Sequence, residues 1–317
     1  MRIGVDIGGM SIKLGLVNEK YEIVGRKVIE THRDTQTAEE IIERMAQAAE
    51  ELLKENGLGV EDCEGIGVAC PGTSDPTTGV VLYSNNIEWK NVEILKLLSH
   101  KLPVPMALAN DADAAALGEV LDGAAKGKNS AVLLTLGTGV GGGVVIDRKV
   151  FLGPLKGGCE PGHMVIVKNG KQCTCGRKGC FETYASATAL MEEARAAAAK
   201  NPDSLMNRYS EGDPLKINGK VIFDAQKQKD PAAVEVVDTY EEDLSIGIAN
   251  LINIFRPEVF ILGGGVSAQK EYLTDALQEK VKSMCFGADL GEIPPIVTSK
   301  LGNDAGIIGA AYLQMEA

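Results

Sequence analysis

The chain lacks the features that carry proteins into or across membranes. No basic and apolar leader precedes its first glycine turn at Gly8 and Gly9, and its longest apolar run, residues 131–146, contains five glycines. A spanning helix needs about 20 consecutive apolar residues, and a signal peptide needs a basic start before an apolar stretch. We therefore expect a cytoplasmic protein with no membrane partner.

Positive charge is also scarce. The sequence holds 32 Lys and Arg against 44 Asp and Glu, a formal net charge of −12. Such a surface repels phosphodiester backbones and anionic lipid. We expect no nucleic-acid partner, and any phosphate site in this chain has to be local.

Cysteine is present but in the wrong number for a disulfide framework. Seven cysteines in a chain without a visible leader favour a reducing compartment. Cys63, Cys70 and Cys285 stand apart and are typical of small core residues. The remaining cluster contains Cys173, Cys175 and Cys180, which need another explanation.

The length and the pattern of hydrophobic residues predict an α/β protein with two lobes. A chain of 317 residues exceeds the roughly 100–200 residues that one core commonly organises. No linker marks the division, and we expect a small lobe of residues 1–113 plus 302–317 and a large lobe of residues 114–301. The predicted helices cover residues 37–57, 186–200, 232–255 and 303–314, the first opening on a capping box at Thr37 and Glu40.

Two glycine turns are candidate phosphate sites. Alternating strands flank Gly8 and Gly9, and a second hairpin turns at residues 137–141. Glycines let backbone N–H groups approach a phosphate closely. Each turn is followed by a strand rather than a helix, which excludes a dinucleotide-binding G-x-G-x-x-G motif. The sequence also contains no G-x-x-x-x-G-K-[ST] motif. A plain hairpin is the alternative for either turn alone. Asp6, just before the first turn, is suited to Mg²⁺ or its water shell.

A second chemical cluster contains one imidazole and three thiols. His163, Cys173, Cys175 and Cys180 lie within eighteen residues, in a polar and glycine-rich segment that would make a poor core. Four such ligands suit a closed tetrahedral Zn²⁺ site with no position left for water. We expect this zinc to be structural.

Several motifs occur in an order that resembles the glucokinases of the ROK family, within the hexokinase and actin superfamily. They are Asp6-Ile7-Gly8-Gly9, Cys70-Pro71-Gly72, Asn110-Asp111, residues 136–143, Glu160-Pro161-Gly162-His163, residues 173–182 and Leu262-Gly263-Gly264-Gly265. Each motif alone is weak, but their order along the whole chain is specific. The resemblance implies an α/β, two-lobed, actin-like ATPase fold (ribonuclease H-like) with a cleft between the lobes.

The resemblance also implies an activity and a set of site residues. We expect transfer of the γ-phosphoryl of ATP, as MgATP, to the 6-hydroxyl of glucose, with Asp111 as the catalytic base. Without the resemblance, Asn110-Asp111 is an ordinary helix cap, and Asn86 is an ordinary turn residue. The implied sugar contacts are Gly72, Asn86, Asn110, Asp111, Glu160, His163 and Glu182. The implied nucleotide contacts are Asp6, Gly8, Gly9, Ser11, Lys13, Gly137, Thr138, Gly139, Gly264 and Gly265.

The chain departs from the family pattern at three positions. Met10 stands where the first glycine turn usually has a threonine, and Ser11 is the nearest substitute hydroxyl. Asp113 replaces a common asparagine and is expected to add a charge near the cleft, and Pro161 replaces an aliphatic residue. These changes leave the catalytic groups in place and bear on the choice of phosphoryl donor.

Three other interpretations remain open at this stage. A kinase for N-acetylmannosamine, mannose or fructose shares the same motifs. A sugar-responsive repressor of this family would carry a helix-turn-helix before the first strand, which here begins at Arg2. A zinc-stabilised module without activity is the third. Relatives are commonly dimers or tetramers, so we expect a homodimer or homotetramer.

Overall fold

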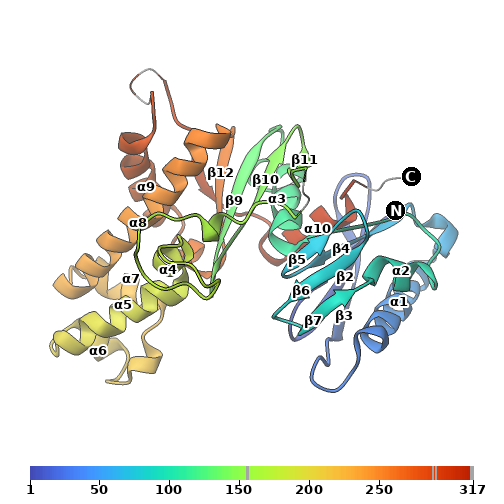
Figure 1. The fold of residues 1–317 in the computed structure, drawn as a ribbon, viewed down its shortest axis with the longest axis horizontal. Coiled ribbons are helices and arrows are strands. Elements are labelled where there is room, and N and C mark those ends of the chain that lie inside the picture. Colours follow the sequence, from blue (N-terminus) through green and yellow to red (C-terminus); the bar gives the residue numbers. More distant parts are fainter. Residues whose placement is uncertain (155–156, 288, 290, 315–317) are drawn as a thin grey trace. The chain divides into compact units, whose positions relative to one another are not determined.

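The structure is a computed structural model that describes residues 1–154, 157–287, 289 and 291–314 (Figure 1). The chain forms two compact units. The first comprises Met1–Leu133, Gly143–Cys159 and Lys300–Ala317, and the second comprises Leu134–Gly142 and Glu160–Ser299. The predicted lobes placed residues 114–133, 143–159 and 300–301 in the other half. Residues 155, 156, 288, 290 and 315–317 of those lobes lie outside the described part, and the lobe assignment stays a prediction.

The first unit is built on a five-stranded sheet with the order β3-β2-β1-β4-β8. Strands β1, β2 and β3 are antiparallel neighbours, whereas β4 and β8 run parallel to β1. A smaller sheet, β5-β6-β7, belongs to the same unit. The bounds are β1 Arg2–Ile7, β2 Ser11–Val17, β3 Ile23–Glu30, β4 Gly65–Cys70, β5 Thr73–Asp75, β6 Val80–Ser84, β7 Trp89–Val92 and β8 Met106–Asn110.

Alternation along β1 decides which helix covers which face of this sheet. Ile3 and Val5 are fully buried in the core beside helix α1 (Ala38–Glu55). Gly4, which points the other way, lies against helix α10 (Ala305–Ala311), as does Gly67 on β4. A Cβ at Gly67 would lie 1.7 Å from the carbonyl oxygen of Ala310, so only glycine permits this close packing. Helices α2 (Ile94–Ser99) and α3 (Asp111–Leu121) complete the unit.

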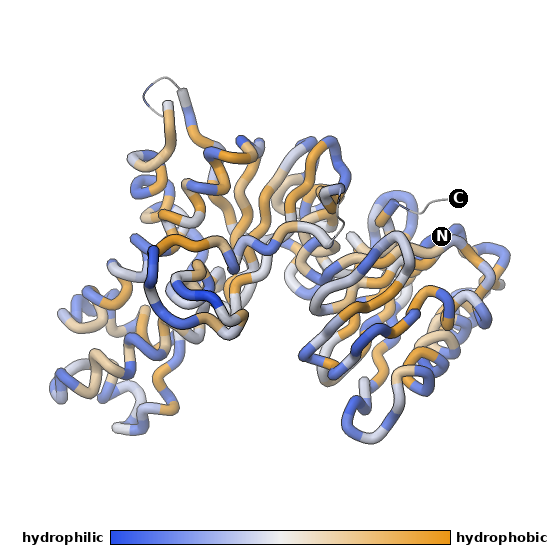
Figure 2. Tube along the Cα trace, viewed as in Figure 1, coloured by the Kyte–Doolittle hydropathy of each residue, from blue (hydrophilic) through white to orange (hydrophobic). Residues whose placement is uncertain are grey.

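The second five-stranded sheet has the order β11-β10-β9-β12-β13. Its strands β9 and β10 contribute residues to both units. The bounds are β9 Ala131–Leu136, β10 Val140–Ile146, β11 Lys149–Val150, β12 Val259–Gly263 and β13 Ile296–Thr298. The helices of the second unit are α4 Glu182–Ala185, α5 Ala187–Lys200, α6 Leu205–Tyr209, α7 Gly219–Lys227, α8 Pro231–Phe255 and α9 Glu271–Met284. Figure 2 shows hydrophobic residues along the strands and hydrophilic residues at many turns.

Most elements predicted from the periodicity are present. Helix α1 opens on the capping box, with the side chain of Thr37 accepting from Glu40 N–H and the Glu40 carboxylate accepting from Thr37 N–H. Both glycine hairpins form. The closing helix is shorter than predicted, because Gly302 adopts a left-handed φ of 56° and residues 302–304 form a separate 3₁₀ turn. Within the described residues, no helix combines the length and apolarity needed to cross a membrane.

Candidate active site

The first glycine turn of the first unit is closed by its own backbone. Gly8 N–H donates to the carbonyl of Ser11 at 2.9 Å, and the hydroxyl of Thr31 donates to the carbonyl of Gly8 at 2.7 Å. Met10 stands at the tip of the turn with 88% of its surface exposed. The turn therefore presents Met10 to solvent, in a geometry held by Thr31, a residue that no sequence motif singled out.

Asn110 and Asp111 join the end of β8 to the start of α3. The Asn110 side chain caps α3 by accepting from Ala112 N–H at 2.8 Å, and its amide group donates to the carbonyl of Gly72 at 2.9 Å. The cap interpretation is thus correct for Asn110. Asp111 is the first residue of the helix and is exposed. Asn110 fixes the Gly72 loop while Asp111 stays accessible to a ligand.

The electrostatics of this region favour a proton-accepting carboxylate. Protein atoms around the Asp111 carboxyl group desolvate it and raise its pKa, while hydrogen bonds from the N–H groups of Ala112 and Asp111 and from the Asn110 side chain act in the opposite direction. Burial also raises the pKa of Asp6, opposed mainly by Lys13 and reinforced by the charge of Asp111. Lys13 Nζ lies 3.6 Å from Asp6 Oδ2. Asp6, Lys13 and Asp111 therefore form one electrostatic group.

Asn86 lies beside the first glycine turn rather than in a separate loop. Its carbonyl oxygen would be 3.0 Å from a Cβ placed at Gly9, and it accepts a hydrogen bond of 2.6 Å from the guanidinium of Arg33. The structure thus connects a predicted sugar contact with a predicted phosphate turn. No sequence pattern singles out Arg33, because a single arginine after a strand matches no motif.

In the second unit, Glu182 lies against the turn at residues 137–139. Its Oε2 accepts from Val140 N–H at 2.9 Å, and a Cβ at Gly139 would lie 2.2 Å from the same oxygen. The hydroxyl of Thr188 donates to the carbonyl of Thr138 at 2.9 Å. The turn is therefore fixed by side chains from the start of α4 and α5. The family resemblance implies a sugar contact for Glu182, and no sequence pattern indicates that it also supports the turn.

The third glycine turn packs against the same strand end. Gly264 has a φ of 80°, and a Cβ there would lie 2.5 Å from the carbonyl oxygen of Leu136. Its own carbonyl accepts from the Ser267 hydroxyl at 2.7 Å. Among the described residues, no atom lies within 4 Å of a Cβ at Gly265. This open side next to residues 137–139 is consistent with the predicted nucleotide contact at Gly264 and Gly265.

The structure brings the four predicted metal ligands together. One ligand atom from each of His163, Cys173, Cys175 and Cys180 lies within 4.8 Å of every other. The Cys173 sulfur is 3.8 Å from His163 Nδ1, and the sulfurs of Cys175 and Cys180 are 3.6 Å apart. A tetrahedron with zinc–sulfur bonds of about 2.3 Å has edges of about 3.8 Å, so the donor set fits zinc.

Hydrogen bonds of Arg177 connect the segments that carry His163 and Cys173. The Arg177 side chain donates to the carbonyl of His163 at 2.9 Å, and Cys173 N–H donates to the carbonyl of Arg177 at 2.8 Å. Hydrogen bonds from Arg177 lower the pKa of the Cys175 thiol to about 6. His163 turns Nδ1 toward the cluster, which leaves Nε2 as the nitrogen for a second ligand.

The predicted site residues thus fall into two groups, one in each unit. Asp6, Gly8, Gly9, Ser11, Lys13, Gly72, Asn86, Asn110 and Asp111 belong to the first unit, and the remainder belong to the second. Asp113, expected to add charge near the site, is 2% exposed and lies against Gly158 instead. Pro161 is buried at the start of a 3₁₀ turn that carries His163, where its fixed φ is compatible with the turn.

The chain matches the ROK family over residues 2–317. The chain belongs to the ROK family. It is 38% identical over 315 residues to a glucokinase of Thermotoga maritima, covering 99% of this chain and 97% of that protein. This ROK protein is also similar to the solved structure of a ROK family glucokinase from Streptomyces griseus in complex with glucose and AMPPNP. The identity is 33%, the TM-score is 0.78, and 98% and 97% of the two chains are covered.

A ROK hexokinase from Thermus thermophilus gives a TM-score of 0.82 at 33% identity, covering 98% of this chain and 96% of that one. The predicted α/β, actin-like ATPase fold is confirmed for this ROK chain by these likenesses. The cleft between lobes stays a prediction.

Proposed function

We propose that this chain is a glucokinase, an ATP-dependent hexose kinase that converts glucose to glucose 6-phosphate. The observation that carries the proposal is the Asn110–Asp111 arrangement, in which Asp111 is the first residue of α3 and the protein atoms around it raise the pKa of its carboxylate. Asn110 holds the neighbouring Gly72 loop at 2.9 Å. Phosphoryl transfer needs a base placed on the acceptor hydroxyl and electrostatic stabilisation of the moving phosphoryl group.

In the proposed reaction the carboxylate of Asp111 accepts the proton of the 6-hydroxyl of glucose. The oxygen forms a bond to the γ-phosphorus, the bond to the β-phosphate oxygen breaks, and ADP leaves with the electron pair. Gly72, Asn86, Asn110, Glu160, His163 and Glu182 would orient the sugar. The turns at Gly8–Gly9 and residues 137–139, with Ser11, Lys13, Gly264 and Gly265, would hold the nucleotide.

Two metal ions belong to the proposal. Mg²⁺, when bound, would neutralise phosphate charge, and Asp6 fits it because its half-buried carboxylate lies just before the first glycine turn. Zn²⁺ would be held by His163, Cys173, Cys175 and Cys180 and would fix the segment that carries His163 and Glu182. We also place the protein in the cytoplasm, as a homodimer or homotetramer.

A coupled assay of ADP release tests the proposal across glucose, mannose, fructose and N-acetylmannosamine, with and without Mg²⁺. We expect the highest kcat/KM with glucose and no turnover without Mg²⁺, since the triphosphate charge is then uncompensated. If another hexose gave a higher kcat/KM than glucose, that hexose would be the preferred substrate. Absence of ADP release with every sugar would overturn the kinase itself.

The raised pKa of Asp111 predicts the direction of the pH profile. The base works only when it is deprotonated, so kcat/KM for glucose should fall as pH decreases through its pKa, at a pH above the ordinary value of 3.8. Asp6 also has a raised pKa, so Asp6→Asn is compared by the shape of its pH profile, normalised to its own maximum, because loss of the proposed Mg²⁺ contact should lower its activity at every pH. The acidic limb should persist in that variant; a limb that vanishes with Asp6 would contradict the assignment to Asp111.

A further inference from the structure

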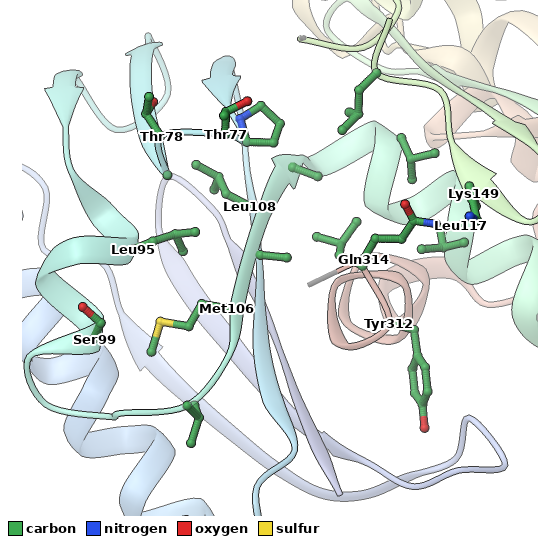
Figure 3. A pocket seen from close by; sticks show the side chains of 18 of the residues that line it. Thr77, Thr78, Leu95, Ser99, Met106, Leu108, Leu117, Lys149, Tyr312 and Gln314 are labelled. Carbon is green, nitrogen blue, oxygen red and sulfur yellow. The ribbon is translucent and has the colours of Figure 1, made fainter. Parts of the chain in front are cut away.

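A cavity of about 610 Å³ lies in the first unit, and none of the candidate active-site residues lines it. It follows strand β8, with the β5–β6 turn and α2 on one side and α3, the β10–β11 turn and the segment after α10 on the other (Figure 3). Its size falls within the range of about 300–1,000 Å³ that is typical of small-molecule sites. The kinase reaction proposed above gives this cavity no role.

The floor of the cavity is apolar and has a polar backbone edge. Leu95, Leu108 and Leu117 line it, and strand β8 is the last strand of its sheet in the described part of the chain. Ile66 N–H donates to the carbonyl of Pro105, so in this parallel pair the odd-numbered residues of β8 bond to β4. The backbone groups of Leu108 therefore point away from β4, toward the edge of the sheet, although Leu108 itself is buried.

The charged residues of the lining are all cations. Lys96, Arg148 and Lys149 line the cavity, and among the residues that the structure describes no Asp or Glu does. This is unexpected in a chain with a net charge of −12. Lys96 pairs with Glu93 at 2.6 Å, but Arg148 and Lys149 have no ion pair within the described residues. Within the described part of the chain, the cavity therefore offers two cations without an ion-pair partner beside an apolar floor.

The turn that carries Arg148 adds to this argument. Val145 pairs with Val150 and Ile146 with Lys149, so β10 and β11 are joined by the two residues Asp147 and Arg148. Both have a left-handed φ, 52° and 60°. Two-residue turns of this kind favour Asn-Gly or Asp-Gly, because glycine adopts a positive φ without strain. The long cationic side chain of Arg148 thus occupies a position where glycine would be more stable. Asp147, the other residue of this turn, does not line the cavity.

We propose that this cavity binds a small organic anion with an apolar body, such as an aryl or alkyl carboxylate, sulfonate or phosphate ester. The apolar body lies over Leu95, Leu108 and Leu117, and the anionic group contacts Arg148 and Lys149. A guanidinium is well suited to the planar or forked oxygens of such groups. The proposal does not depend on the glucokinase activity, because it uses none of the residues assigned to that reaction.

Calorimetric titration of the full chain with naphthalene-2-sulfonate, without ATP or sugar, tests the site. We expect one molecule bound per chain, and no binding of naphthalen-2-ylmethylammonium, which has the same apolar body and the opposite charge. The double variant Arg148→Glu/Lys149→Glu should weaken binding by about tenfold or more. The matched control is Lys54→Glu/Lys282→Glu, which makes the same charge change at two exposed helical lysines and should alter binding by less than about twofold.

Circular dichroism establishes that both double variants are folded, and Arg148→Gln/Lys149→Gln provides a milder version of the same test. A probe that fails to bind the parent chain would overturn the proposal. So would equal losses in the two double variants, since long-range charge alone would then explain binding. Displacement of the probe by excess MgATP would also overturn it, because the probe would then occupy the nucleotide site.

Discussion

Replacing Asp111 with asparagine is expected to lower kcat for glucose phosphorylation by about 10²- to 10⁴-fold while leaving glucose affinity nearly unchanged. The amide keeps the size of the carboxylate and its position at the start of α3, but it cannot accept the proton of the 6-hydroxyl. The Asn110 cap, which accepts from Ala112 N–H at 2.8 Å, is untouched by the change. Steady-state kinetics with the coupled assay and calorimetric titration with glucose measure the two quantities.

Asp122→Asn is the matched control for this substitution. Asp122 caps the other end of the same helix and pairs with Lys126 at 2.5 Å on the surface. Loss of an exposed ion pair costs at most about 1 kcal/mol, so this variant should keep near-normal turnover. If the Asp111→Asn variant kept kcat within about threefold of the parent value, Asp111 would not be the base. The main argument for the proposed mechanism would then fail.

The second large effect is expected from Cys180→Ser. Cys180 is fully buried in the cluster, and its sulfur lies 3.6 Å from that of Cys175. Loss of one ligand should release the zinc, and because structural zinc contributes directly to folding, the second unit should lose roughly 3–5 kcal/mol of stability. Metal analysis by mass spectrometry and thermal unfolding measure the two changes, the latter as a decrease in Tm of roughly 6–20 °C.

The zinc site is also expected to act on the sugar. At temperatures where the Cys180→Ser chain remains folded, KM for glucose should rise before kcat falls, since His163 and Glu182 belong to the segment that the metal fixes. Cys285→Ser, at a half-buried cysteine outside the cluster, should keep its zinc and its KM. A metal-free preparation with parental Tm and KM would show that the four residues hold no structural ion.

The sequence predicts only those parts of the candidate site whose chemistry can be recognised from the spacing of residues along the chain. The spacing of His163 and the three cysteines predicts a zinc site without any fold, and the structure places their ligand atoms within 4.8 Å. Capping at Thr37, both glycine hairpins and the long helix α8 follow from local patterns in the same way. The roles of Asp111 and the sugar contacts required the family resemblance, because an Asn-Asp pair is locally no more than a helix cap.

Contacts between segments distant in the sequence could not be predicted. The hydrogen bond from Arg33 to Asn86, the contact of Glu182 with the Gly139 turn and the burial of Asp113 join parts of the chain that have no shared pattern. The cationic cavity along β8 is of this kind too, since Lys96 and Arg148 line one cavity only once the strands have paired.

The sequence alone determined the local elements of this protein, the donor set for a metal and, through ordered motifs, its family. The tertiary structure decided which side chains meet, which carboxylates are desolvated and where the cavity along β8 opens. The physical reason is that hydrogen bonding and side-chain periodicity within a strand or helix act between near neighbours. Packing and electrostatics instead depend on distances that exist only after the sheets have formed.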